Sequence, residues 1–379
     1  MKDNRRLFWT VLALSMVIAL AGCGPTWSFS LSTPEGGMVT IDQGTWEKYA
    51  PLAGEEGLSL EKILYDQGFR ILDQLVVTGP DGQEMAYNWV EEARDVWLQA
   101  GGDLLLGAEE MRPRHIEVTS SPWESRVEAG IYDIAPTAAA ALNIPVPEIS
   151  TGTRLASHRA EHVLLLFLDG FGYLRYTEAA EAGLIPVLET LDPPLMGLTT
   201  YPPITTVSTA SLLTGSEPQV HGVETRGLRK TDQVTLLEIA VREGLDVQAV
   251  EGEALAFQLS GAEFQLSGDR DEDGNTDDNA LENTLAVLED GMPDLFLVHF
   301  HGIDDMGHEV GPGHSREKEK IREVDQAVGE ILNKLPPETL VIIFADHGMH
   351  RVQGEERAGN HGHLIPRDML VPIWLVYLD

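Results

Sequence analysis

The most constraining feature of the sequence is a continuous apolar run, His162–Leu168, which ends in Asp169 and Gly170. Seven residues without polar alternation predict a strand that is buried on both faces, as in a parallel sheet covered by helices. Open α/β sheets bind their ligands at the carboxyl ends of such strands. The run therefore predicts an α/β fold and makes Asp169 a candidate site residue.

A turn rich in threonine and serine, residues 204–208, leads into a helix-like segment, residues 209–213. A hydroxyl at a helix start lies near unpaired backbone N–H groups and the positive end of the helix dipole. That environment suits a nucleophile that attacks a phosphorus centre. An ordinary Ser/Thr helix cap explains this stretch equally well when it is taken alone.

Two later apolar runs, residues 294–300 and 339–345, also predict buried strands. Side chains able to bind metals follow these runs or lie in a glycine-flanked turn near the C-terminus: Asp304, His308, Asp346, His347, His361 and His363. Mixed Asp/His ligation suits Zn²⁺ or another borderline divalent ion. Two such ions about 4 Å apart can activate a hydroxyl and hold phosphoryl oxygens. Because the pattern recurs at strand ends, it favours a metal centre over separate structural roles.

These motifs resemble the alkaline phosphatase superfamily, in its type I phosphodiesterase/nucleotide pyrophosphatase branch. The matching stretches cover about residues 160–379 and read FLDG, the threonine-rich turn with TGSEPQVHG, DDMGHEVGPG, ADHGM and GNHGHLIPRDMLVPIWL. The resemblance implies an alkaline-phosphatase-like three-layer α/β/α sandwich with a mixed, mostly parallel sheet. It also implies a phosphoric ester hydrolase with two divalent ions, Zn²⁺ first and Mn²⁺ second.

The resemblance further implies a role for each candidate residue. One ion would be held by Asp169, Asp346 and His347, with the nucleophile touching it, and the other by Asp304, His308 and His361. The family's spacing places the nucleophile at Thr205, with Thr206 as the runner-up. His361 is preferred to His363 because the family's ligand directly precedes a glycine, here Gly362.

The first functional hypothesis is thus a phosphodiesterase or nucleotide pyrophosphatase that acts on a small phosphate ester. Many nucleotide pyrophosphatases carry a Pro-Asn-His turn after the nucleophile, whereas residues 207–209 here are Val-Ser-Thr, which weakens the case for nucleotides. A phosphomonoesterase or phosphonate hydrolase of the same superfamily is the second hypothesis. A non-catalytic envelope-binding lipoprotein is the third. A sulfatase is disfavoured because the turn has neither a cysteine nor a Ser-x-Pro-x-Arg pattern.

The N-terminus predicts a lipoprotein. Residues 1–22 combine three basic residues with a short apolar stretch, as in a signal peptide, and Leu-Ala-Gly-Cys23 resembles the bacterial lipobox. We therefore expect an extracytoplasmic protein that is anchored to the membrane by lipid on Cys23, the only cysteine of the chain. The formal net charge of −35 argues against binding to nucleic-acid polymers.

The remaining sequence predicts the domain organisation. Residues 23–44, rich in Gly, Ser, Thr and Pro, suggest a tether, and residues 45–118 suggest a small α+β domain with a second helix near residues 88–99. The catalytic domain would then span residues 119–379.

An acidic stretch, residues 268–279, resembles a calcium loop. Asp269, Asp271, Asp273 and Asp277 match its alternating ligands, but Ala280 stands where the bidentate glutamate is expected. The stretch therefore predicts either a calcium site or a solvated acidic loop.

The segment GIYDIAPTAAAALNIPVP, at residues 130–147, resembles one that usually follows the last strand in this superfamily. Here it precedes the first catalytic strand, so we predict a circular permutation in which residues 119–155 are a displaced C-terminal segment. The helix from Asp133 to Asn143 should then belong to the catalytic domain, beside the strand Val371–Leu378. Ile134, Leu142 and Ile144 should be buried there. A chance match of an alanine-rich helix is the alternative.

Overall fold

The computed structural model describes residues 27–90, 95–107, 109–270, 272, 274–353 and 357–379. The predicted signal peptide and Cys23 lie outside this range. The chain divides into a smaller unit, up to Phe69 plus Gln74–Thr119, and a larger one, Arg70–Asp73 plus Ser120–Asp379. Within the described residues, no helix has the length and apolar character needed to cross a membrane.

The smaller unit is an α+β structure with two sheets. One sheet has the strand order β2-β1-β9-β4-β5 and the other β3-β6-β7-β8. Its elements are β1 (Ser28–Ser32), β2 (Met38–Asp42), α2 (Gln43–Tyr49), β3 (Leu58–Ser59), α3 (Leu60–Asp66), β4 (Leu72–Thr78), β5 (Glu84–Asn88), β6 (Val96–Leu98), β7 (Leu104–Leu106), β8 (Glu109–Met111) and β9 (His115–Ser120).

Two sequence predictions are wrong in this unit. The tether expected over residues 23–44 contains the antiparallel pair β1–β2, in which Phe29 and Leu31 are buried. These apolar residues alternate with serine, which is a strand pattern, whereas the tether was predicted from amino-acid composition alone. The helix expected near residues 88–99 is also wrong, because β6 lies there and pairs with β3 and β7.

The larger unit is built on an eight-stranded sheet with the order β10-β12-β19-β16-β11-β15-β13-β14. Only β19 runs antiparallel to its neighbours β12 and β16, so the sheet is mixed and mostly parallel. Its strands are β10 (Ala129–Gly130), β11 (His162–Leu168), β12 (Leu195–Leu198), β13 (Val247–Glu251), β14 (Glu263–Leu266), β15 (Leu295–Phe300), β16 (Thr339–Phe344) and β19 (Leu370–Leu378), and a separate ribbon pairs β17 (His350–Arg351) with β18 (Gly359–Asn360).

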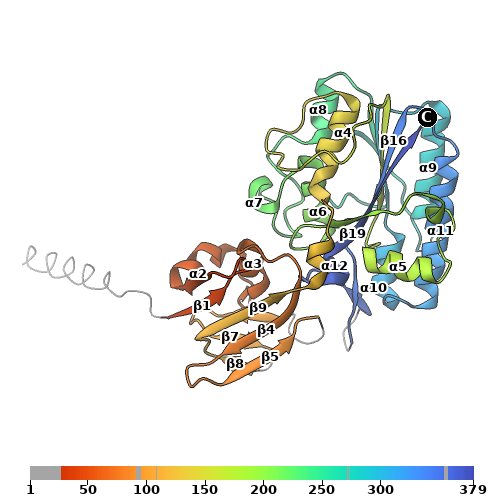
Figure 1. Cartoon of the computed structure of the whole chain (residues 1–379). Coiled ribbons are helices and arrows are strands. Elements are labelled where there is room, and N and C mark those ends of the chain that lie inside the picture. Colours follow the sequence, from red (N-terminus) through yellow and green to blue (C-terminus); the bar gives the residue numbers. More distant parts are fainter. Residues whose placement is uncertain (1–26, 91–94, 108, 271, 273, 354–356) are drawn as a thin grey trace, which may run out of the picture. The chain divides into compact units, whose positions relative to one another are not determined.

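Helices cover both faces of this sheet, as Figure 1 shows. The helices are α4 (Ile134–Leu142), α5 (Tyr173–Glu181), α6 (Thr205–Thr214), α7 (Pro218–His221), α8 (Leu236–Arg242), α9 (Asp277–Asp290), α10 (Gly302–Val310), α11 (Ser315–Leu332) and α12 (Pro366–Met369). One core joins the odd-numbered side chains of β11 to α4, α6 and α8, and the other joins the even-numbered ones to α5, α9 and α11. The predicted three-layer α/β/α sandwich is therefore confirmed.

The central strands β11, β13, β15 and β16 run parallel, so their carboxyl ends meet at one edge of the sheet. Asp169 follows β11 and Asp346 follows β16 at that edge, and β15 leads through His301 into α10. The order of the strands thereby brings together side chains that are far apart in the sequence.

Helix α4 lies in the larger unit and packs in the same core as Ile373 of β19. Ile134 is fully buried there, while Leu142 and Ile144 are partly buried against that core. The segment 130–147 thus packs within the unit that holds the candidate site.

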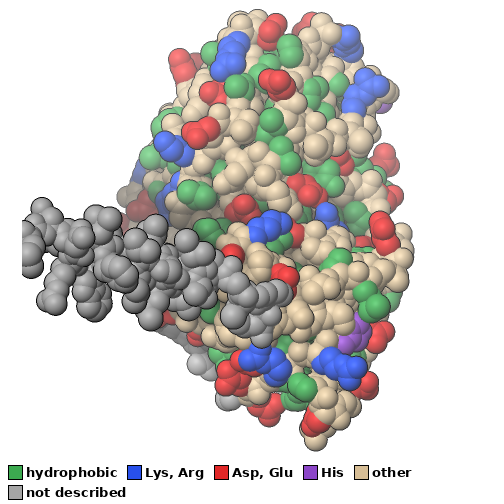
Figure 2. All heavy atoms as spheres, turned by 90° about the vertical axis from the view of Figure 1, so that its left-hand side faces the viewer, with side chains coloured by type: hydrophobic (Ala, Val, Ile, Leu, Met, Phe, Trp, Pro, Cys, Tyr) green, Lys and Arg blue, Asp and Glu red, His purple; other side chains and the backbone are tan. Residues whose placement is uncertain are grey.

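Charged side chains are dispersed on the side of the molecule drawn in Figure 2. Lys and Arg side chains on that side stand singly or in small groups among Asp, Glu and apolar side chains. This mixture is typical of a solvated surface.

Candidate functional site

The first candidate group consists of Asp304, His308 and His361, whose ligand atoms all lie within 4.8 Å of one another. Asp304 and His308 are four residues apart on α10, and this spacing places both on the same face of the helix. His308 Nε2 lies 3.2 Å from Asp304 Oδ2, and His361 Nε2 lies 3.9 Å from Asp304 Oδ1. His361 comes from the turn that follows β18.

Backbone carbonyls fix the tautomers of both histidines. The Nδ1–H of His308 donates to the carbonyl of Gly359 at 2.8 Å, and that of His361 donates to the carbonyl of Pro203 at 2.8 Å. In neutral rings both Nε2 atoms then carry lone pairs, yet these two atoms are only 3.2 Å apart. Two facing lone pairs beside a carboxylate repel one another, and a bound cation removes the repulsion.

The second group consists of Asp169, Asp346 and His347. His347 donates its Nδ1–H to the carbonyl of Gly348 at 3.0 Å, which leaves Nε2 as an acceptor. This Nε2 lies 3.2 Å from Asp346 Oδ2 and 3.5 Å from Asp169 Oδ1. The rings of His347 and His361 stack at 3.7 Å, so the two groups form one continuous centre.

Three carboxylate oxygens in this centre are buried and have no hydrogen-bond partner within the described part of the chain. They are Asp169 Oδ1, Asp304 Oδ1 and Asp346 Oδ2. Buried polar atoms are almost always hydrogen-bonded, so each of these oxygens requires an explanation. A divalent cation at each group supplies one, and the donor set of imidazole and carboxylate suits zinc.

The electrostatics of the carboxylates also favour a bound cation. Burial, together with the charge of Asp169, raises the pKa of Asp346 well above its usual value. Burial and Asp169 would also raise the pKa of Asp304, but the hydrogen bond with His308 and the nearby His361 lower it to about 2. Several buried carboxylates that lie close together repel one another, so a bound positive charge stabilises the site.

Gly170 allows the two groups to approach each other. Its φ of +67° is a left-handed conformation that favours glycine. A Cβ atom at this position would lie 2.7 Å from Asp304 Oδ1 and 2.9 Å from Asp304 Cβ. Its backbone N–H also donates to Asp346 Oδ1 at 3.1 Å.

The two candidate nucleophiles differ in their surroundings. Thr205 is the first residue of α6, and its Oγ1 lies 3.3 Å from His347 Nε2. Since that nitrogen is an acceptor, the Thr205 hydroxyl donates to it. The Thr206 hydroxyl instead donates to the carbonyl of Ala256 at 3.4 Å. Thr205 thus faces the candidate metal centre, and the alternative residue bonds to the backbone.

His363, the alternative to His361, lies outside both groups. Its backbone N–H donates to Asp368 Oδ2 at 3.0 Å, and its ring lies 5.3 Å from the ring of His350. His350 in turn contacts Asp368 through Nδ1 at 2.8 Å. The structure therefore groups His361, and not His363, with Asp304.

The acidic loop lies partly outside the described residues, which exclude Asp271 and Asp273. Asp277 is the first residue of α9. Its buried carboxylate accepts the backbone N–H groups of His301 at 2.8 Å and Gly302 at 3.0 Å. Calcium binding by this loop stays a prediction.

The sequence prediction omitted three residues that belong to the surroundings of Asp169. They are His299, His301 and Glu251. His299 and His301 form a third group with Asp169, and Glu251 at the end of β13 contacts both imidazoles. A signal for them exists in the sequence, because residues two apart at the end of a strand point to the same side. The signal for Glu251 is weaker, since only its place at a strand end marks it.

Comparisons with known proteins agree with the motifs. Residues 256–373 match the family model described as type I phosphodiesterase / nucleotide pyrophosphatase. GPI ethanolamine phosphate transferase 3 of Schizosaccharomyces pombe is 31% identical over 86 residues, which are 23% of this chain and 9% of that protein. The mouse catalytic subunit of GPI ethanolamine phosphate transferase 3 is 34% identical over 73 residues, or 19% of this chain and 7% of that protein. The chain thus spans less than a tenth of the length of these two relatives.

Two solved structures are similar at lower identity. Phosphonoacetate hydrolase from Sinorhizobium meliloti 1021 in complex with phosphonoformate is 18% identical, with a TM-score of 0.42 over 56% of this chain and 61% of that one. Murine ectonucleotide pyrophosphatase / phosphodiesterase 5 is 16% identical, with a TM-score of 0.41 over 51% of this chain and 58% of that one. By the family model alone, residues 256–373 are similar to the type I phosphodiesterase / nucleotide pyrophosphatase family; they include Asp304, His308, Asp346, His347 and His361.

Proposed function

We propose that this protein is a metal-dependent hydrolase of phosphate esters, of the phosphodiesterase or nucleotide pyrophosphatase type, with Thr205 as its nucleophile. One observation carries the proposal. The Thr205 hydroxyl, at the start of α6, lies 3.3 Å from His347 Nε2, beside buried carboxylate oxygens that have no donor among the described residues. A hydroxyl in such a place is suited to nucleophilic attack on phosphorus.

The residues of the chain divide the work of the reaction. Two divalent ions, Zn²⁺ first and Mn²⁺ second, would supply the positive charge that stabilises phosphoryl oxygens and favours the ionised hydroxyl. Asp169, Asp346 and His347 would hold one ion and Asp304, His308 and His361 the other. The Thr205 hydroxyl loses its proton, and Oγ1 forms a bond to phosphorus as the bond to the leaving oxygen breaks; that oxygen takes up a proton and departs as an alcohol. Water then hydrolyses the phosphothreonine, which releases the phosphate monoester and restores the Thr205 hydroxyl.

The substrate is a small phosphate ester. The matched relatives are named for transfer of ethanolamine phosphate, so an ethanolamine-phosphate diester is the first natural substrate class to test. Ser208 stands where nucleotide pyrophosphatases carry their phosphoryl-binding asparagine, and its hydroxyl is bonded to Thr199 in the core at 3.0 Å. This arrangement favours substrates other than nucleotides, including monoesters or phosphonates as the second candidate class.

A paired substitution tests the nucleophile. Thr205→Ala should lower hydrolysis of bis(p-nitrophenyl) phosphate by about 10³-fold or more, since the covalent route is lost. Thr206→Ala is the matched control and should retain most of the rate. Both variants should keep the metal content of the wild type. Loss of activity in Thr206→Ala with retention in Thr205→Ala would show that the nucleophile is Thr206.

The same probes separate the functional classes. Faster turnover of the diester than of p-nitrophenyl phosphate supports a phosphodiesterase, and the reverse order supports a monoesterase. Metal-loaded protein that turns over neither these probes nor ethanolamine-phosphate diesters and phosphonates would support a non-catalytic envelope-binding protein.

We also propose that the protein is attached to the extracytoplasmic side of a membrane by lipid on Cys23, because residues 20–23 resemble a lipobox. Labelling with a radioactive fatty acid should mark the wild type and not Cys23→Ser. Equal labelling of both would contradict the anchor.

The circular permutation is a further part of this proposal. Packing of α4 in the same core as Ile373 supports it, because a displaced C-terminal segment should return to the last strand. A protein that begins at residue 155 should therefore be unstable and inactive. Full stability and activity of that shortened chain would refute the permutation.

A further inference from the structure

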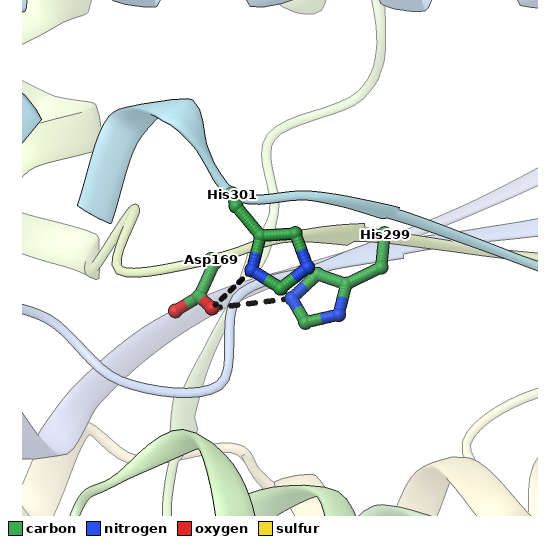
Figure 3. A group of neighbouring side chains, drawn as sticks. All are labelled: Asp169, His299 and His301. Atoms are coloured by element: carbon green, nitrogen blue, oxygen red, sulfur yellow. Dashed lines mark hydrogen bonds and ion pairs between the residues drawn. The ribbon is translucent and has the colours of Figure 1, made fainter. Parts of the chain in front are cut away.

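The two histidines at the end of β15 form a stack that faces Asp169, as Figure 3 shows. The ring of His299 lies between the rings of Phe167 and His301, with centroid distances of 3.6 Å and 3.7 Å. His299 and Phe167 are almost fully buried. The stack therefore fixes the plane of the His299 imidazole and the directions of its two nitrogens.

Each ring places one nitrogen toward Asp169 and the other toward Glu251. His299 Nε2 and His301 Nδ1 lie 3.2 Å and 3.4 Å from the same oxygen, Asp169 Oδ2. The opposite nitrogens, His299 Nδ1 and His301 Nε2, each lie 3.0 Å from Glu251 Oε2. Two imidazoles thus bridge two carboxylates through four close contacts.

The number of protons does not match the number of contacts. A neutral imidazole has one N–H, so two neutral rings offer two donors for four nitrogen–oxygen contacts. If Glu251 accepts both protons, the nitrogens at Asp169 carry lone pairs that face a carboxylate oxygen. Full protonation of both rings would instead bring two buried imidazolium ions into contact at 3.7 Å, which like-charge repulsion opposes.

We propose that His299 Nε2, His301 Nδ1 and Asp169 Oδ2 form a third cation-binding site, for zinc or another divalent transition metal. Glu251 accepts the remaining N–H of each ring and so holds both histidines in the ligating tautomer. A carboxylate behind a ligating histidine is the usual outer partner of a metal site. Two imidazoles and one carboxylate are also a donor set that such ions accept.

An ion can reach this group from solvent. His301 lines a cavity of about 270 Å³ together with Glu253, Asp269, Thr276 and Asp305, and its side chain is 17% exposed. The carboxylates of this cavity give it a negative wall, which raises the local concentration of cations. Gly252 leaves room for the His301 ring, because a Cβ atom there would lie 2.8 Å from His301 Cδ2.

The third site does not depend on the proposed hydrolase activity. It uses Oδ2 of Asp169, whereas the orphaned oxygen that faces His347 is Oδ1. The two oxygens of one carboxylate can thus serve two neighbouring ions. The site adds two ligands, His299 and His301, that none of the sequence motifs contains.

Native mass spectrometry of the full chain, stripped of metal and titrated with zinc, tests the site. The wild type should saturate at three ions, and His301→Ala should saturate at two. Glu251→Gln should still bind a third ion, but 10- to 100-fold more weakly, since the outer partner is altered. His363→Ala is the matched control and should bind three.

The inference would be overturned if His301→Ala bound as many ions as the wild type, which is the outcome expected of a purely hydrogen-bonded network. His308→Ala distinguishes this outcome from failure of the proposed catalytic centre, because it should lose an ion from the first group alone. Circular dichroism confirms that each variant is folded, and His299→Asn provides a second probe of the same site.

Discussion

Two carboxylate-rich regions of the larger unit use their charges differently. In the centre around Asp169, three buried oxygens have no donor within the residues that the structure describes. In the acidic loop, the carboxylate of Asp269 accepts the backbone N–H of Gly274, and that of Asp277 accepts two backbone N–H groups at the start of α10. Buried oxygens without donors need a cation, whereas oxygens bonded to the backbone do not. A metal site is therefore identified by buried oxygens that lack a hydrogen-bond donor, and not by the number of acidic residues.

We expect the largest loss of hydrolytic activity when the bound metal is removed. Treatment with a chelator should lower phosphodiester hydrolysis by at least about 10³-fold, because bound ions contribute several kcal/mol of charge stabilisation. Zinc, or manganese, should restore the rate. Activity measured beside elemental analysis checks the prediction, and full activity in protein shown to be free of transition metal would contradict it.

The two histidines of the C-terminal turn, His361 and His363, differ in their surroundings and should differ in their effect on metal binding. His361→Ala should remove one ion and lower activity by about 10²- to 10³-fold, since its Nε2 faces Asp304 and His308. His363→Ala should keep both the ion and most of the activity, because its backbone and ring lie beside Asp368 and His350. Metal analysis of the two variants checks the pair. Equal loss in both would show that the turn as a whole, and not one ligand, matters.

His221 offers a buried imidazole whose nitrogens are both satisfied by the protein. Its Nδ1 accepts the backbone N–H of Val223 at 3.1 Å, and its Nε2–H donates to Ser211 Oγ at 2.9 Å. Burial lowers the pKa of His221 from 6.5 to about 4. The unfolded chain therefore binds more protons between these pH values, and stability falls as the pH drops through this window.

The size of that effect can be measured by a substitution. Between pH 6.5 and pH 5, the wild type should lose about 1.6 kcal/mol of unfolding free energy more than His221→Gln, because the slope approaches about 1.4 kcal/mol per pH unit only below pH 6. Denaturant unfolding at the two pH values checks the difference. Parallel losses in both proteins would show that His221 is not held neutral in the folded state.

Calcium binding by the acidic loop should stabilise the folded protein only slightly. Because Asp277 is already bonded to the backbone, any site there lacks a strong ligand, and we expect a dissociation constant no tighter than about 10⁻⁴ M. At about 1 mM calcium this corresponds to at most about 1.4 kcal/mol of stabilisation. A calcium titration followed by thermal unfolding measures it. Micromolar affinity would remove the distinction between the two carboxylate-rich regions.

Much of the fold followed from local sequence patterns. The apolar runs that end at Leu168, Phe300 and Ala345 contain β11, β15 and β16, because short apolar runs of this kind fit strands that are buried on both faces. The polar residues that follow them meet because parallel strands share one edge. The antiparallel β1–β2 pair was missed because its small polar residues resemble those of a linker.

The candidate site was harder to predict where the chain uses tertiary contacts. The groups around Asp304 and Asp346 follow from short motifs, but the tautomers of their histidines depend on distant carbonyls such as that of Pro203. His299 and Glu251 lie on neighbouring strands but are 48 positions apart in the chain, so no local sequence pattern contains their contact. Sequence motifs therefore predict ligands better than they predict the partners that orient them.

Anomalous X-ray scattering at the zinc edge, from crystals of the full chain grown with zinc and calcium, would locate the ions. We expect zinc peaks between Asp304, His308 and His361 and between Asp169, Asp346 and His347, with none at Asp277. An additional peak beside His299 and His301 would support the third site separately. Zinc bound only in the acidic loop, or no zinc at the two Asp/His groups, would show that these groups are not the metal centre.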